Sequence, residues 1–109
     1  MAENRRVLGQ SAPAAITLTD ILTIGGATQC VISSLVVANR SAVDDIFRVS
    51  VAINGAADAN AQYIYYDITI PGNDTFIATV GITLDDTDVV RVYSRNGTSS
   101  FNLFGVLIT

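Results

Sequence analysis

Histidine, lysine and tryptophan are absent from this chain of 109 residues. Because His is the commonest metal ligand and a frequent general base, its absence removes the usual parts of a hydrolytic or metal centre. The six cationic residues are therefore all Arg, and the net charge at pH 7 is −4. A nucleic-acid binder is expected to carry a basic stripe, so we expect no nucleic-acid partner.

Cysteine and long apolar runs are also scarce. Cys30 is the single cysteine, which excludes an internal disulfide, and its run CVISSLVVA predicts a buried, inert thiol. Half of the residues are hydrophobic, yet no run reaches the roughly 18 apolar residues of a membrane helix, so no membrane partner is expected. The N-terminus lacks the apolar segment of a signal peptide, which favours synthesis in a cytoplasm.

What the chain does contain is a repeated alternation of apolar and polar residues. It predicts strands over 46–53, 63–70 and 75–84, and Ile, Val and Thr enrichment adds 15–24 and 29–38. Turn signals separate these runs, which predicts an all-β, single-domain antiparallel β-sandwich, jelly-roll-like, of about seven strands over residues 13–109. Residues 1–12 are expected to form an N-terminal arm. The predicted inward residues are Phe47, Val49, Val51 and Ile53, then Ile64, Tyr66, Ile68 and Ile70, then Phe76, Ala78, Val80, Ile82 and Leu84.

The pair Asn96-Gly97 predicts the turn of a final hairpin, because both residues tolerate positive φ in a type I′ turn. Centred there, the hairpin pairs Val92 with Phe101 and Val90 with Leu103 on a core face. The opposite, outward face would hold Arg91, Tyr93, Arg95, Ser100 and Asn102.

Carboxylates are the remaining candidates for catalytic or metal-binding groups. The stretch DDTD at 85–88 is interpreted as a turn in which Asp and Thr bond the backbone, with a calcium loop as the alternative. A carboxylate pair at Asp44 and Asp45, or within 85–88, could serve a glycosidase, but adjacent Asp in a turn are common. Ser and Thr have no His or Lys to activate them. We therefore predict a non-enzymatic protein with no catalytic residue, no metal site and no cofactor.

Several sequence segments resemble those of a known group of proteins: VLGQSAPAA, LVVANRS, FRVSVAINGAAD, QYIYYD, PGNDTF, GITL, DVVRVYS and SFNLFG. Together they resemble small β-proteins encoded among the virion genes of tailed bacteriophages, from Val7 to the C-terminus. The resemblance implies a structural component of the particle, such as a head decoration (cement) protein or a tail or fibre component. It implies no catalytic residues.

The function expected from these observations is that of a capsid decoration protein on the outer surface of the virion, assembled in the host cytoplasm. Its partners would be the major capsid protein and copies of itself in a homotrimer. The alternative is a tail or fibre component that contacts host glycan through Tyr63, Tyr65, Tyr66 and Tyr93. The sandwich core is expected to begin near Ile16 and not to need the arm. The predicted partner-interface residues are Arg5, Arg6, Val7 and Leu8 in the arm, and Arg91, Tyr93 and Arg95 on the hairpin face.

Overall fold

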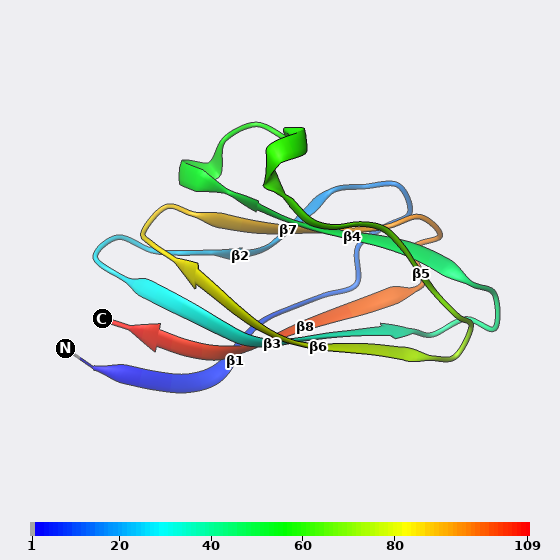
Figure 1. Ribbon diagram of the computed structural model, residues 1–109, viewed down its shortest axis with the longest axis horizontal. Helices are drawn as coiled ribbons and strands as arrows, with labels where there is room; N and C mark the ends of the chain where they lie inside the picture. The colour runs from blue at the N-terminus through cyan, green and yellow to red at the C-terminus, as the bar shows by residue number, and fades with distance from the viewer. Residues whose placement is uncertain (1) are drawn as a thin grey trace.

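The computed structural model describes residues 2–109 as two packed β-sheets of four strands each (Figure 1). Sheet A has the order β1-β8-β3-β6 and sheet B the order β2-β7-β4-β5. All neighbouring strands are antiparallel, and most connections cross between the sheets, which is a jelly-roll arrangement. The elements are β1 (Glu3–Ser11), β2 (Thr19–Thr23), β3 (Gln29–Asn39), β4 (Asp45–Ala52), the 3₁₀ turns η1 (Ile53–Gly55) and η2 (Asn60–Gln62), β5 (Tyr63–Ile70), β6 (Thr75–Leu84), β7 (Val89–Ser94) and β8 (Ser99–Ile108).

The predicted jelly-roll-like sandwich is confirmed, with eight strands in place of about seven. The additional strand is β1, which occupies the segment that the sequence predicts as an arm. It pairs with β8 from Glu3 opposite Ile108 to Ser11 opposite Phe101. An edge strand has only one neighbour, and most side chains of β1 are exposed, so the segment shows no apolar alternation. Leu8 alone among its large side chains packs against the core.

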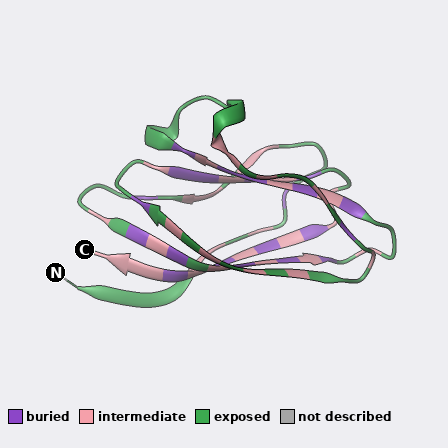
Figure 2. Cartoon of the chain, in the orientation of Figure 1, coloured by how far each residue is buried: buried purple, intermediate pink, exposed green. Residues whose placement is uncertain are grey.

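The core lies between the sheets, and alternate residues of β3, β4, β7 and β8 supply most of its buried side chains (Figure 2). In the centre the rings of Phe47 and Phe101 meet nearly edge to face, with 6.0 Å between their centroids. The alternation predicted for β6 is confirmed, because its even-numbered residues from Phe76 to Ile82 face inward. Cys30 is fully buried, as predicted, and burial raises the pKa of its thiol.

The predicted hairpin is wrong in its pairing and right in its core face. β7 pairs with β2 and β4, whereas β8 pairs with β1 and β3, so the two strands belong to different sheets. In the connecting turn only Gly97 has positive φ, at 70°, which excludes a type I′ turn. Two strands that face each other across a core bury the same alternate residues as a hairpin would. The residues predicted for the core are all buried: Val90, Val92, Phe101 and Leu103.

The predicted inner face of β5 is wrong in its first half. β4 pairs Phe47 with Ile68 and Val49 with Tyr65, so Tyr66 and Asp67 together oppose a single residue. This is a β-bulge, with φ of 52° at Asp67. The bulge reverses the alternation, so Tyr65 packs against the core and Tyr66 is 54% exposed. Two further residues predicted inward are also exposed: Ile64 before the bulge and Ile53 in η1.

Candidate functional site

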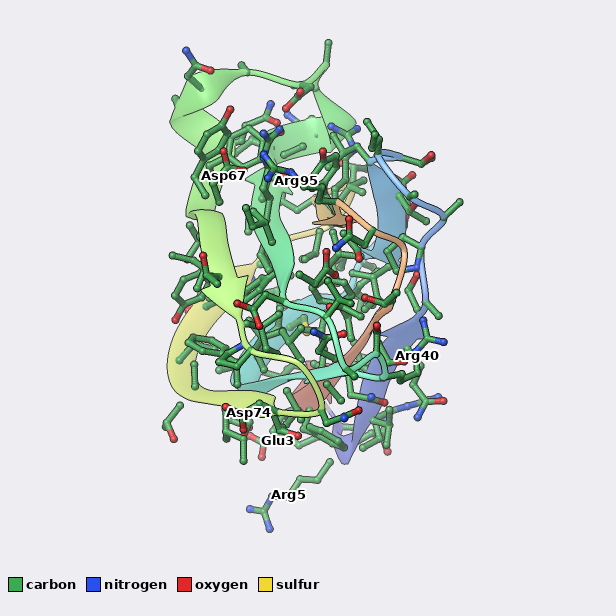
Figure 3. All side chains as sticks on the ribbon, turned by 90° about the vertical axis from the view of Figure 1, so that its right-hand side faces the viewer. Glu3, Arg5, Arg40, Asp67, Asp74 and Arg95 are labelled. Carbon is green, nitrogen blue, oxygen red and sulfur yellow. The ribbon has the colours of Figure 1, made fainter. Side chains whose placement is uncertain are left out.

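The predicted interface residues form two groups on opposite sheets. Arg5, Arg6, Val7 and Leu8 lie on β1 of sheet A, whereas Arg91, Tyr93 and Arg95 lie on or just after β7 of sheet B. Figure 3 shows Arg95 and Asp67 on one side of the molecule and the Arg5 side chain projecting from the opposite side. The structure therefore presents two separate candidate surfaces.

The outer surface of sheet A carries apolar side chains on all four strands, with Ser34, Thr79 and Asn102 among them. Leu103 is buried and Gly105 is closely covered, so the alternate residues Phe104 and Val106 face away from the core. Val7 lies directly opposite Phe104 and is 43% exposed. No second layer covers this surface within the described chain. We call it the apolar face, and its residues are Val7, Val31, Val36, Ile77, Phe104 and Val106.

The four β1 residues differ in their availability to a partner. Leu8 packs against the core and lies close to Gly105, where an added Cβ would be 2.9 Å from Leu8 Cδ1. Leu8 is half-buried by its own domain, so its position does not favour the prediction that it anchors a partner. Arg5 is exposed beside the apolar face, and Arg6 is exposed with Nε donating to the Val7 carbonyl over 3.3 Å. Arg5, Arg6 and Val7 remain available on the surface.

On sheet B the outer surface is organised around Arg48, a residue that no sequence pattern singles out. The Arg48 guanidinium lies 4.2 Å from the centroid of the Tyr66 ring and 4.4 Å from that of the Tyr93 ring. Such cation–π contacts hold the guanidinium between the two rings. Its Nε also lies 2.6 Å from Asp67 Oδ1, and this hydrogen bond raises the pKa of Arg48. Tyr93, a predicted interface residue, is thus engaged by Arg48 of its own chain.

Arg91 is also committed within its own chain. Its Nε donates to Asp20 Oδ1 over 3.0 Å, and its terminal nitrogens donate to the carbonyls of Ala56 and Gly55 over 2.8 and 3.3 Å. Its side chain is 15% exposed. Arg91 therefore holds the 53–62 loop against sheet B, and the prediction that it contacts a partner is not favoured by its position. Arg95 is exposed beyond the end of β7 and remains available.

A hollow of about 440 Å³ lies beside the Arg48 cluster and is lined by Asn60, Tyr63 and Tyr66. The two Tyr rings meet edge to face with centroids 5.0 Å apart. The Tyr63 hydroxyl donates to Asp58 over 2.8 Å, and burial together with this bond raises the Tyr63 pKa. The hollow presents aromatic surface next to amide and hydroxyl groups. Of the four Tyr considered for glycan contact, Tyr65 is unsuited because it packs inward.

The carboxylates considered for catalysis have structural contacts instead. Asp45 is 1% exposed and accepts hydrogen bonds from the Ser94 hydroxyl, from Ser99 Oγ over 2.6 Å and from the Asn96 N–H over 2.9 Å. Burial by itself would raise the Asp45 pKa, but these bonds and one from the Ile46 backbone outweigh it and lower the pKa. Asp44 Oδ1 accepts the Gly72 N–H over 3.1 Å. The pair joins loops through these hydrogen bonds.

The acidic stretch 85–88 forms the turn between β6 and β7, as predicted. Asp88 accepts the N–H groups of Asp85 over 2.9 Å and of Asn54 over 3.0 Å, and Asp85 accepts the N–H of Asp86 over 2.8 Å. Within residues 2–109, no group of three or more His, Cys, Asp or Glu side chains is placed to hold a metal ion. The carboxylates of Asp85 and Asp88 thus accept hydrogen bonds from backbone N–H groups.

Over the part of the chain that the structure describes, no helix has the length and apolarity to cross a membrane. Comparison of the chain with protein-family models, with curated proteins and with solved structures found no match.

Proposed function

We propose that this chain is a non-enzymatic structural protein of a bacteriophage virion, a capsid decoration protein that binds the outer surface of the major capsid shell and stabilises it. The observation that carries the proposal is the apolar face of sheet A, which lies open beside Arg5. Val7 and Ile77 are exposed, and the other residues of the face are half-buried. Apolar surface that the chain itself leaves uncovered is typical of a site that another protein covers. The phage particle as the partner rests on the sequence resemblance.

The apolar face has the chemistry of a docking surface. Ile77 is 70% exposed and Val7 is 43% exposed, and burial of such a side chain contributes roughly 1.5–3 kcal/mol. Arg5 at the rim can form a bidentate pair with a carboxylate of the shell. Because a shell offers many equivalent sites, linked copies would attach more tightly than one domain alone.

The test is occupancy on phage shells purified without this protein. Val7→Asp places a charge at the β1 side of the apolar face, opposite Phe104, and we expect strongly reduced occupancy with an unchanged circular dichroism spectrum. The matched control is Val43→Asp, since Val43 is 66% exposed in the β3–β4 loop, away from this face. Equal occupancy of the two variants would exclude the apolar face as the docking surface.

The second candidate function is contact with host glycan by a tail or fibre component. It is favoured by the hollow at Asn60, Tyr63 and Tyr66, where aromatic surface adjoins polar groups that can bond sugar hydroxyls. Tyr66→Ala should abolish retention on a glycan array. Tyr65→Phe, which changes an inward ring, should not. Absence of retention for the unaltered protein would remove this candidate.

A further inference from the structure

The two sheets leave four edge strands, and three of them carry features that discourage pairing with another chain. β1 carries Glu3, Arg5 and Arg6. β2 has only five residues, one of them Asp20, and its register against β7 shifts between Asp20 and Leu22. β5 is broken by the bulge at Asp67. Charge, shortness and bulges are the usual protection of exposed sheet edges.

β6 is the exception among the four. Its ten residues, TFIATVGITL, include no charged residue and no proline. A register shift against β3 falls at Val80 and Gly81, so the segment Thr75–Thr79 before it is regular. Ile77, in the middle of this segment, is 70% exposed. The first half of β6 is therefore a regular, uncharged edge.

The hydrogen-bond pattern of β3 and β6 shows which backbone groups this edge presents. The Asn39 N–H donates to the Asp74 carbonyl over 2.9 Å, and the register places these two residues opposite each other. Bonded and non-bonded pairs alternate along an antiparallel ladder. Phe76 and Ala78 therefore bond β3, and Thr75, Ile77 and Thr79 direct their N–H and C=O groups away from the sheet. One of these groups, the Thr75 N–H, is already bonded by Asp74 Oδ1 over 2.8 Å.

We propose that β6 pairs antiparallel with β6 of a second copy of this chain, about a two-fold axis at Ile77. In this register Ile77 lies opposite its own counterpart, and Thr75 lies opposite Thr79 of the other copy. Four backbone hydrogen bonds can then join the two copies. Two link the N–H of each Ile77 to the carbonyl of the other Ile77, and two link each Thr79 N–H to the Thr75 carbonyl of the other copy. The Asp74–Thr75 bond can remain in place. The edge is thus complementary to itself, as a two-fold interface requires.

The side chains match in the same register. On the outer face Ile77 meets Ile77, flanked by β-branched Thr pairs, and such cross-strand pairs stabilise a sheet. On the inner face the large Phe76 lies opposite the small Ala78 of the other copy. A chain of net charge −4 would repel its copy least through an uncharged strand.

The pairing joins two sheets A into one sheet of eight strands and places two apolar faces side by side. It gives an even-numbered assembly, so the homotrimer expected from the sequence would need a different surface. The inference does not rest on the proposed function, because the pairing can be measured with the isolated protein and without any particle.

The first test is sedimentation of the full chain over a wide range of concentration. We expect a reversible monomer–dimer equilibrium. Ile77→Lys should shift it to monomer, since two like charges would lie opposite each other at the axis. Thr83→Lys is the matched control, because Thr83 is exposed on the same strand beyond the register shift, and it should leave dimerisation unchanged. A monomer at every concentration, or equal loss in both variants, would overturn the proposal.

The second test detects the dimer even where the two copies associate weakly. Cα atoms of directly opposed, hydrogen-bonded residues lie about 5.5 Å apart, within disulfide range. Ile77→Cys should therefore form a covalent dimer under mild oxidation, visible on a non-reducing gel, because Cys30 is fully buried and does not compete. Thr83→Cys should stay monomeric under the same conditions. Absence of cross-linking at position 77, or equal cross-linking at position 83, would contradict the register.

Discussion

Asp45 joins the start of β4 to the turn between β7 and β8 through bonds from Ser94, Ser99 and the Asn96 backbone. Asn39 acts in the same region, with Nδ2 donating to the Val43 carbonyl over 2.8 Å and Oδ1 accepting from Thr98 over 2.9 Å. Each of these polar groups is buried or half-buried and satisfied. A buried carboxylate with several donors stabilises a fold only while it is ionised and its partners are present.

Replacement of this carboxylate tests its contribution. Asp45→Asn should lower the free energy of unfolding at pH 7 by about 2–3 kcal/mol, because hydrogen bonds to a charged acceptor are lost or weakened. Chemical denaturation measures the difference. Asp86→Asn is the control, since the Asp86 side chain is exposed and accepts no hydrogen bond within residues 2–109. A loss of the same size at both positions would contradict a special role for Asp45.

The pH dependence follows from the direction of the pKa shift. The folded-state pKa of Asp45 is lowered, so its stabilising contribution is complete above the unfolded value of about 3.9. It is lost as the pH falls from there through the folded pKa. The stability difference between the unaltered protein and Asp45→Asn should therefore be constant near neutrality and shrink in acid. A difference that is constant down to strongly acid pH would disprove the shift.

The central aromatic pair gives a second prediction at the residue scale. Phe101→Ala should cost about 3–5 kcal/mol, because the side chain is fully buried against Phe47. Arg95→Ala should cost less than about 0.5 kcal/mol, because its side chain is exposed. Melting temperatures of the two variants compare these costs. Equal losses would show that the assignment of core and surface is wrong.

At the scale of elements, short turns with specific side-chain bonds connect the two sheets. The turn at 85–88 bonds its own backbone through Asp85 and Asp88, and Asp88 also reaches the N–H of Asn54 in η1. The turn at Asn96-Gly97 requires positive φ at Gly97, where an added Cβ would lie 2.7 Å from the Ala15 nitrogen. Both turns lead the chain from one sheet to the other, from β6 to β7 and from β7 to β8.

Metal dependence tests the interpretation of the acidic turn. Because the Asp85 and Asp88 carboxylates bond backbone N–H groups, a chelator should leave the melting temperature unchanged, and added calcium should have no effect. Thermal unfolding followed by circular dichroism measures both. A rise of many degrees with calcium would show that the 85–88 turn binds the ion, as the alternative interpretation holds.

At the scale of the whole molecule, β1 decides whether the domain is complete. It covers the edge of β8 along eight paired positions and contributes Leu8 to the core. The sequence predicts that the domain folds without this segment, whereas the pairing favours the opposite. The edge strand both completes sheet A and carries Arg5 and Val7 on its surface.

Deletion of residues 2–11 should therefore destabilise the protein by about 2 kcal/mol or more, since buried apolar surface and a row of backbone bonds are lost. Chemical denaturation provides the measurement. The double variant Arg5→Ala and Arg6→Ala keeps the strand and should retain stability. Unchanged stability of the truncated protein would mean that the segment behaves as an arm.

Local sequence patterns were enough to establish the class of fold and most of its core. Alternation identified Phe47, Val49, Phe101 and Leu103 as inward, because a strand directs successive side chains to opposite faces whatever its neighbours are. Turn residues located most strand ends for the same local reason. The absence of His and Lys likewise limits the chemistry that is open to the chain.

Long-range pairing, in contrast, decided which strands are neighbours and which surfaces remain open. The alternation of β7 and β8 fits a hairpin and a sandwich equally, and contacts distant in sequence chose the sandwich. The bulge at Asp67 reversed the face of Tyr65 and Tyr66, which placed Arg48 between two rings. Ile77 is exposed because β6 forms an edge of sheet A, and Arg91 is occupied by hydrogen bonds to Asp20 and to the loop carbonyls, so both outcomes depend on segments distant in sequence. Such outcomes depend on contacts between strands, and a local pattern does not encode those contacts.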